Sequence, residues 1–466
     1  MFYGMTKDLN NKNEIYFPSY SGSNDNLNSL VNKTSQIICD WYSNAEKYGP
    51  LPIDEGFKCL MPSENGNSPE DLFSEIEDLL SNSFNPVHPG SLAHLDPPPL
   101  ILSILGDLIA AALNNNLLAY ELSPSLTNLE ESLFKWFSKK IGFGDNSGGI
   151  AASGGTLSNL NALIAARDHS GLSSDPNAVF LISEEAHSSF IKCAKIMGLH
   201  ENNLIKVRTD KEGSMDLRSL KNKISECSIN NKKIFSIVAT LGTTIRGALD
   251  PIEGICDICK NNNIWLHIDG SIGGIYSVTN IKINGLTHIN LADSITINPQ
   301  KILGITKTSS LLLVSNIETL KKTFSTGLPY ITSKNDVFDR GELGLQGSRP
   351  AEVIKLWLGL RFLGIKGIEN ILNSSIDRKV FFEKNLSSEK YEIYSGPLHI
   401  ISFLPKGMSI KDSNSWTNIN RLKLLKNNFM LSRPEFNGKY YLRAVMGNYN
   451  TSESHIRDLL KILNSI

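Results

Sequence analysis

The chain has 466 residues, more than a single hydrophobic core usually serves, so we expect one large domain with smaller flanking elements. Hydrophobic residues make up 41% of it and charged residues 20%, as is ordinary for a globular protein in water. The formal net charge of −1 is unlike the strongly basic composition of proteins that bind nucleic acids or anionic membranes, so neither partner is expected.

The sequence carries no pattern typical of membrane insertion, secretion or metal binding. The longest apolar stretch, residues 100–113, is too short to span a bilayer and contains Asp107. The N-terminus lacks the basic-then-apolar pattern of a signal peptide, and the six cysteines are scattered, so we expect a cytoplasmic protein without a disulfide framework. Cys256 and Cys259 form a CxxC motif, but no second Cys or His pair lies nearby in sequence. Two small apolar side chains on a helix are therefore favoured over a redox or metal site.

The order of the elements along the chain predicts the fold class. Residues 1–85 predict a helical N-terminal segment with helices near 28–47 and 69–82, and the proline-rich segment 88–99 is expected to be a loop. Helices are then expected at 100–114, 127–141, 187–197, 216–227 and 251–262, and strands at 178–183, 204–208, 234–240, 264–269, 294–298 and 309–315. The alternation after residue 150 predicts an α/β fold, with a mostly parallel sheet and helices on both faces. Ligands of such sheets bind beyond the carboxyl ends of the strands.

The last part of the chain is expected to form a separate unit. A helix near 351–363 would connect the large domain, residues 86–364, with a smaller C-terminal α+β domain, residues 365–466.

A first candidate binding site is the sequence SGGT, residues 153–156, which opens an amphipathic helix. Gly154 and Gly155 would let the backbone approach a ligand closely, and the free N–H groups at a helix N-terminus suit a phosphate. A tight turn in which Ser153 or Thr156 caps the helix explains the motif equally well. The chain contains neither a GxGxxG nor a GxxxxGK[ST] motif, which argues against a dinucleotide or nucleoside triphosphate site.

Two more candidates lie at predicted strand ends. Asp269 ends the strand at 264–269, where a buried carboxylate needs a cationic partner such as a protonated pyridine nitrogen. Lys301 follows the strand at 294–298, where burial would lower the pKa of its amine and free it to attack an aldehyde. Taken alone, the acid could cap a loop and the lysine could lie on the surface. A phosphate site, an acid and a lysine in this order are what a pyridoxal 5'-phosphate (PLP) site needs.

Around these residues the chain resembles the group II PLP-dependent amino-acid decarboxylases, which include aromatic-amino-acid, glutamate and diaminobutyrate decarboxylases. The resemblance runs from about Pro86 to the C-terminus, through the motifs HPGSLAHL, SPSLTNLE, EEAHSSFIKCAKIMG, VATLGTTIRGALDPI, LHIDGSIGG, NPQKILG and YYLRAVMGNYNT. It implies the PLP-dependent transferase-like fold (fold type I), PLP as the cofactor, and a homodimer with the site at the subunit interface.

The resemblance also implies roles for single residues. Lys301 would hold PLP as a Schiff base, Asp269 would bind the pyridine nitrogen, and His187 would stack on the ring. Thr244 would contact the phenolic oxygen, and Tyr330 would protonate the substrate carbon after CO₂ leaves. The remaining cofactor contacts would be Gly154, Gly155, Thr156, Ser271, Asn298 and Gln300.

Two further residues are implied on the substrate side. Arg443 would pair with the substrate carboxylate, since Arg suits bidentate pairing, although a structural ion pair explains it equally well. His88 lies in the motif that resembles the family's substrate-side segment.

Four positions depart from the family's pattern. Gln300 stands where the family has histidine, Ile302 where it has tryptophan, and Gly270 where it has alanine. Ser348 replaces the first arginine of the family's GRR motif. These changes leave the cofactor anchors intact and put the substrate and the rate in question.

The function expected from these residues is the decarboxylation of an L-amino acid to its amine and CO₂. Another PLP-dependent lyase or an aldehyde synthase on the same fold is an alternative, because fold alone does not fix function. A non-catalytic protein of this fold that binds metabolites is a third hypothesis, motivated by the four departures.

Overall fold

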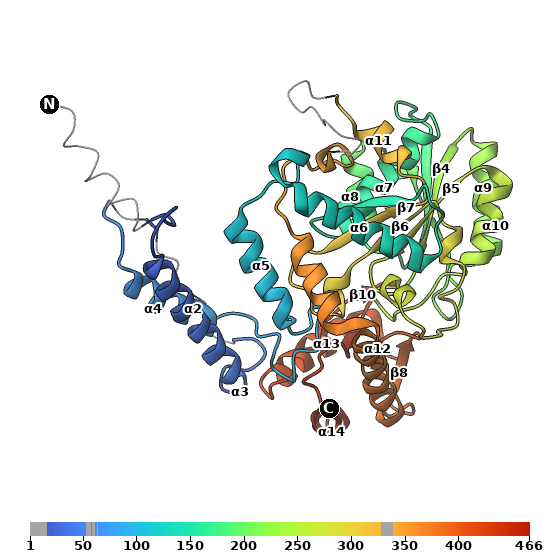
Figure 1. The fold of residues 1–466 in the computed structure, drawn as a ribbon. Coiled ribbons are helices and arrows are strands. Elements are labelled where there is room, and N and C mark those ends of the chain that lie inside the picture. The colour runs from blue at the N-terminus through green and yellow to red at the C-terminus, as the bar shows by residue number, and fades with distance from the viewer. Residues whose placement is uncertain (1–15, 53–56, 58–60, 63, 328–338) are drawn as a thin grey trace.

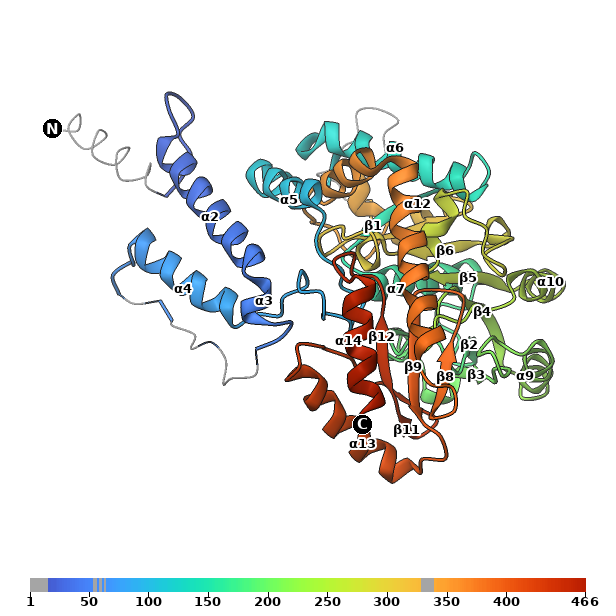
Figure 2. The same cartoon turned by 90° about the horizontal axis from the view of Figure 1, so that it is seen from below.

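The N-terminal part of the structure is a small group of helices. The computed structural model describes residues 16–52, 57, 61–62, 64–327 and 339–466. Helix α2 (Asp25–Ser43) is followed by the short α3 (Ala45–Tyr48) and by α4 (Pro69–Ser81). Figures 1 and 2 show α2 and α4 side by side, away from the helices around the large sheet. The two helices predicted in this segment are therefore confirmed.

A seven-stranded sheet forms the centre of the chain (Figure 1). In space its strands lie in the order β1-β7-β6-β5-β4-β2-β3. β7 is antiparallel to both of its neighbours, and the other pairs are parallel, which confirms the predicted α/β fold with a mostly parallel sheet. The strands are β1 (Gly148–Ala152), β2 (Ala178–Ser183), β3 (Leu204–Val207), β4 (Lys233–Thr240), β5 (Trp265–Gly270), β6 (Ser294–Ile297) and β7 (Ser310–Val314).

Strand β1 is absent from the sequence-based prediction, because its sequence GGIAA contains two glycines, which disfavour strands. The structure explains one of them. A Cβ atom on Gly149 would lie 2.1 Å from the carbonyl oxygen of Leu312 and 2.5 Å from Cδ1 of Phe134. Helix α6 (Pro124–Ile141), which carries Phe134, therefore passes too close to β1 for any larger residue.

Helices cover both faces of the sheet. Helix α7 (Gly155–His169) packs on one face, where its Leu160 and Leu163 share a core with Trp265 of β5. Helix α10 (Ile252–Asn262) packs on the other face, with Leu266 of β5. Side chains alternate along a strand, so neighbouring residues of β5 serve the two cores. The other helices of this part are α5 (Ile101–Leu113), α8 (Ser189–Ile196), α9 (Leu217–Ile229) and α11 (Glu318–Phe324).

A second, smaller sheet lies in the C-terminal part, as predicted. Strands β8 (Tyr391–Ser395), β9 (Ile400–Pro405) and β12 (Leu442–Val445) are antiparallel, in the order β12-β9-β8. The remaining elements here are helices α13 (Ile410–Leu425) and α14 (Glu453–Asn464) and the short hairpin β10 (Glu435–Phe436) and β11 (Lys439–Tyr440). Among the described residues, no helix combines the length and apolarity needed to cross a bilayer.

The helix that leads into this part is longer than predicted. Helix α12 runs from Val353 to Asn385, whereas the sequence predicts its end near residue 363. Gly364 does leave helical geometry, with φ of 58° and ψ of 178°, so the predicted stop exists. The chain re-enters a helix directly after it, and the sequence signal marks a kink instead of an end.

The buried carboxylate of Glu130, in α6, forms hydrogen bonds with Arg340 and Arg349, which lie in the segment that follows α11 in the sequence. Both oxygens of Glu130 accept hydrogen bonds from Arg349, at 2.7 and 2.6 Å, and Arg340 Nε donates to Oε1 at 3.1 Å. Burial alone would raise the pKa of Glu130, but the two guanidinium groups lower it to about 2. Arg349 is the arginine that remains where the family has its GRR motif, and its partner in the structure is Glu130.

We expect Glu130→Gln to destabilise the fold by about 3–5 kcal/mol, because it leaves two guanidinium groups buried without an anion. The contribution of Glu130 is complete above the ordinary carboxyl pKa of 4.5 and is lost as pH falls towards about 2. Urea unfolding should therefore show a gap between wild type and variant that is full at pH 7 and shrinks below pH 4.5.

The neighbouring Glu131 is a matched control, since it pairs with Lys135 at 2.6 Å on the surface. Glu131→Gln should change stability by less than about 1 kcal/mol. A gap for Glu130→Gln that stays constant down to pH 3 would contradict the assigned role of the buried charge.

Candidate active site

The predicted site residues converge at the carboxyl ends of β5 and β6. These two strands are parallel, so Asp269 at the end of β5 lies at the same edge of the sheet as Lys301, which follows β6 in the turn Pro299–Lys301. Each of the two side chains acts on the charge of the other, and His187 also acts on Asp269. Asp269, Lys301 and His187, which are far apart in sequence, are thus brought together.

Asp269 is a carboxylate held ionised in a buried position. It is 5% exposed and accepts hydrogen bonds from the Ser271 N–H and from Asn159 Nδ2, both at 3.1 Å. Burial would raise the pKa of this carboxyl, but the Lys301 ammonium, the Ser271 hydrogen bond and two histidines lower it below its usual value. A negative charge is therefore available for a cationic partner such as a protonated pyridine.

Lys301 has an amine that is easily deprotonated. Burial lowers the pKa of the amine, and Arg443 lowers it further, while Asp269 and Asp96 act in the opposite direction. A lowered pKa increases the fraction of neutral amine, which is the form that attacks an aldehyde.

The N-terminus of α7 has the features of an anion site. Gly154 is its N-cap, with φ of 150°, and no side chain caps the helix, so the alternative in which Ser153 or Thr156 caps it is wrong. A Cβ atom on Gly155 would lie 2.8 Å from Asn298 Nδ2 and 2.9 Å from Ser271 Oγ. Asn298 Oδ1 accepts from Ser310 Oγ at 2.6 Å, which turns the amide N–H₂ towards this helix end. Helix N–H groups and two side-chain donors therefore face one place, as a phosphate requires.

Three other predicted cofactor contacts lie around this group. His187 is exposed, and its Nδ1 accepts from the Ser189 N–H at 3.2 Å. Thr244 is half-buried, and its carbonyl oxygen accepts from Arg443. Gln300 Oε1 accepts from the Ser309 N–H at 2.5 Å, which leaves its amide N–H₂ for another partner.

Arg443 holds two loops of the site together. It is 6% exposed, and it donates from Nε to Ser432 Oγ at 2.9 Å, from Nη1 to the Thr244 carbonyl at 2.8 Å and from Nη2 to the Ala93 carbonyl at 3.0 Å. Burial lowers its pKa to about 10. These bonds use three of its five N–H groups, so two are left for a ligand.

His88 is not brought to this group within the chain. Its Nδ1 accepts from the Gly90 N–H at 2.9 Å, and the charges that act on its pKa are those of Glu46 and His455. Tyr330 lies outside the described residues.

The sequence reasoning did not single out several polar residues that the structure places at the site. Asn159 and His267 lie behind Asp269. Asp96 forms an ion pair with Lys307 and acts on Lys301, and His94 is near both Asp96 and Arg443. The alternation of Trp265, His267 and Asp269 in the strand sequence WLHID was the available signal, because such residues share one face.

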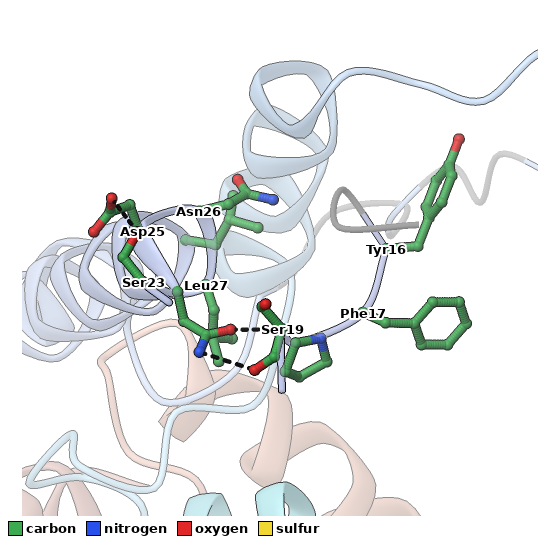
Figure 3. A pocket seen from close by; sticks show the side chains of 10 residues that line it. Tyr16, Phe17, Ser19, Ser23, Asp25, Asn26 and Leu27 are labelled. Atoms are coloured by element: carbon green, nitrogen blue, oxygen red, sulfur yellow. Dashed lines mark hydrogen bonds between the residues drawn. The ribbon is translucent and has the colours of Figure 1, made fainter. Parts of the chain in front are cut away.

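A pocket elsewhere in the chain has no connection with these residues. Figure 3 shows it at the start of α2, where Tyr16, Phe17 and Leu27 are among the lining residues and the Asn24 side chain bonds to the Ser19 backbone. It contains none of the predicted site residues.

Comparisons with known proteins agree with this site. Residues 56–401 match the model of the pyridoxal-dependent decarboxylase conserved domain. The chain is 28% identical over 411 residues to the aromatic-L-amino-acid decarboxylase of Bacillus atrophaeus, covering 86% of each chain. It is 32% identical over 366 residues to the acidic amino acid decarboxylase GADL1 of Xenopus tropicalis, covering 75% of this chain and 70% of the relative.

The fold is similar to that of solved structures. A crystal structure of Oryza sativa TDC with PLP and tryptamine superimposes with a TM-score of 0.89 at 20% identity, over 96% of this chain and 98% of the other. The predicted family, cofactor and decarboxylase activity are confirmed by the family model and the relatives together. The chain therefore belongs to the family of pyridoxal-dependent decarboxylases, enzymes that decarboxylate amino acids with PLP.

Proposed function

We propose that this decarboxylase attaches PLP to Lys301 and acts on an L-amino acid, releasing its α-carboxyl group as CO₂ and leaving the amine. The observation that carries the assignment is the placement of Lys301 and the ionised Asp269 at one edge of the sheet, beside the uncapped start of α7. Asp269 would pair with a pyridine nitrogen, Lys301 would react with an aldehyde, and the start of α7 would bind a phosphate.

The residues fit the cofactor part by part. The phosphate would be held by the start of α7 and its surroundings, and the residues concerned are Gly154, Gly155, Thr156, Ser271, Asn298 and Gln300. Asp269 would bind the pyridine nitrogen, His187 would stack on the ring, and Thr244 would contact the phenolic oxygen. When bound, PLP supplies an electron sink for the electron pair that the departing carboxyl group leaves behind.

The chain's own residues would bind the substrate and move the protons. The two N–H groups of Arg443 that have no acceptor among the described residues can pair with the substrate carboxylate and orient it. The Lys301 amine would exchange with the substrate amine, and Tyr330 would deliver a proton to the substrate carbon after CO₂ leaves. The proposal for Tyr330 rests on its spacing from Lys301 in the sequence.

We further propose that the protein is a cytoplasmic homodimer. The support for a dimer is an apolar surface on α5, since gathered exposed apolar side chains are typical of protein–protein contacts. Its residues are Ile101, Leu105, Leu108, Ile109 and Leu113, each 43% exposed or more. Sedimentation velocity of the wild type and of Leu108→Glu tests this, since a charge in the interface should shift a dimer to the monomer.

The domain division proposed from the sequence remains 1–85, 86–364 and 365–466. The group of α2 and α4, the separate three-stranded sheet and the kink at Gly364 support it. Limited proteolysis with sequencing of the fragments tests these boundaries.

Borohydride reduction of the PLP-loaded protein tests the cofactor assignment. After digestion, mass spectrometry should find the reduced cofactor on Lys301. A panel of aromatic, acidic and short basic L-amino acids, with CO₂, amine and aldehyde measured together, then tests the reaction. Aldehyde in place of amine would identify an aldehyde synthase, and a cofactor adduct on another lysine would refute the assignment of Lys301.

We expect Gly155→Ala to weaken PLP binding by about tenfold or more, since a shift of about 1.4 kcal/mol is already tenfold in affinity. The added Cβ would force Asn298 and Ser271 away from the start of α7. Fluorescence titration of the apoprotein with PLP measures the effect. Gly144→Ala is the control, because no atom lies within 4 Å of its added Cβ, and its affinity should be unchanged.

A further inference from the structure

A continuous line of buried polar side chains runs from Asp269 into the core. Trp265, His267 and Asp269 alternate along β5 and so share the face that α7 covers. Ser294 of β6 is the register partner of His267, and Asn159 lies one turn into α7. His267 and Ser294 are fully buried, and Asn159 is 1% exposed.

Four hydrogen bonds connect these side chains. Trp265 Nε1 donates to Ser294 Oγ at 2.8 Å, and Ser294 Oγ is 2.9 Å from His267 Nδ1. His267 Nε2 is 3.1 Å from Asn159 Oδ1, and Asn159 Nδ2 donates to Asp269 Oδ2 at 3.1 Å. We call Trp265, Ser294, His267 and Asn159 the Asp269 relay.

The direction of every bond in the relay follows from its two ends. The indole N–H of Trp265 can only donate, and an ionised Asp269 can only accept. The amide N–H₂ of Asn159 must then face Asp269, so its oxygen faces His267, and His267 carries its proton on Nε2. Burial lowers the pKa of His267 to about 4, so the ring is neutral and its Nδ1 accepts from the Ser294 hydroxyl. Each donor therefore points towards the carboxylate.

We propose that Asn159, His267, Ser294 and Trp265 are positioning residues that hold Asp269 as a carboxylate aimed at the pyridine nitrogen of PLP. The inference rests on the proposed function, and it concerns how firmly this chain keeps the ring nitrogen protonated. The Lys301 ammonium also favours the ionised form of Asp269, and the hydrogen bonds from Asn159 and Ser271 act on the same carboxylate.

The relay has a consequence that packing alone would not have. If Asn159 loses its amide, one oxygen of a buried carboxylate loses its donor, and the ionised form of Asp269 becomes less favourable. Loss of this donor makes Asp269 a stronger base, so a proton shared between Asp269 and the pyridine nitrogen should move towards Asp269 and leave the ring nitrogen less protonated.

The experiment uses protein loaded with PLP that carries ¹⁵N in the ring, and reads the nitrogen chemical shift as a function of pH. Asn159→Leu and His267→Leu should each move the nitrogen shift towards that of neutral pyridine, Asn159→Leu by an amount that corresponds to about one pKa unit, which is a tenfold change in how the proton is distributed between the ring nitrogen and Asp269. His267→Gln should restore most of the wild-type value, because an amide N–H can still donate to Asn159 Oδ1. Trp265→Phe should change the nitrogen shift least, because four hydrogen bonds separate Trp265 from Asp269.

His399→Leu is the matched control. His399 is as fully buried as His267, and neither of its ring nitrogens has a hydrogen-bond partner in the described part of the chain. This variant should leave the ¹⁵N titration unchanged even if its melting temperature falls. If Asn159→Leu fails to fold, the His267→Leu and His267→Gln pair decides the question.

Different results would contradict the role of the relay and the proposed function. Wild-type protein without a cofactor adduct on Lys301 would overturn the proposed function itself. Wild-type protein with the adduct, but with ¹⁵N titrations of the Asn159 and His267 variants that match those of wild type and His399→Leu, would overturn the relay alone. A shift that is largest at Asn159 and is restored by His267→Gln supports it.

Discussion

Lys301→Ala should lower turnover by at least about 10⁴-fold, because alanine can neither hold the cofactor aldehyde nor exchange with the substrate amine. Lys301 is the residue proposed for both tasks, and it lies in the turn after β6, where the charge of Asp269 acts on its amine. The measurement is single-turnover and multiple-turnover CO₂ release from the preferred amino acid, together with the visible spectrum of the PLP-loaded protein.

Two variants show whether the loss is specific. Lys301→Arg keeps the positive charge but cannot join an aldehyde at physiological pH, so it should be as inactive as the alanine variant. Lys307→Ala removes the nearby exposed lysine that pairs with Asp96, and the cofactor adduct should remain on Lys301. Multiple turnovers by Lys301→Ala at more than a few per cent of the wild-type rate would show that another group carries the cofactor.

Asp269→Asn should reduce kcat by about 10²- to 10⁴-fold, with the fold preserved. The substitution keeps the size of the side chain and removes its charge, which leaves the protonated ring nitrogen without an anion in a buried position. An uncompensated buried charge is unfavourable by about 3–5 kcal/mol, and each 1.36 kcal/mol corresponds to a factor of ten. Steady-state CO₂ release and the PLP dissociation constant measure the effect, and both should worsen.

Asp293→Asn provides the comparison within the same sheet. Its Oδ2 accepts from the Leu266 N–H of β5 at 2.7 Å, and an amide oxygen can accept that bond equally well. Its kcat should stay within about twofold of wild type, since a neutral hydrogen bond is retained. Equal losses in the two variants would mean that the effect of Asp269→Asn comes from general damage to the sheet.

The parts of the fold that the sequence predicts well are those in which local pattern and tertiary packing agree. The apolar runs of β2 and β4 are buried strands in the structure, and the strand-end positions of Asp269 and Lys301 follow from the same pattern. Strand β1 is different, because Gly149 is required by the close approach of Phe134, which no local rule contains. The predicted end of the helix near Gly364 likewise reflects local sequence. The second half of α12, after Gly364, depends on packing against the C-terminal sheet.

Some residues of the candidate site can be predicted from the sequence and others cannot. The acid Asp269, the amine Lys301 and the glycine motif at 153–156 can be found from residue type and order, because few other residues could serve these chemical roles. The alternation in WLHID points to His267, but Asn159 cannot be found in this way, since its place beside Asp269 requires that one turn of α7 lies over one face of β5. The substrate contact of His88 stays a prediction that rests on a motif match, and the charges of Glu46 and His455 act on the pKa of its ring.

The antiparallel strand β7 also limits when the site can form during synthesis. β1 ends directly before Ser153 and Gly154, yet its hydrogen-bonded neighbour in the sheet is β7, more than 150 residues later. When only the first half of the chain has been translated, the start of α7 is present, but β7, the strand that pairs with β1 just before it, is not. Such distant pairings slow folding. Nascent chains that end before Val314 should consequently be unable to retain the vitamin-derived cofactor, however much of the preceding sheet has already assembled.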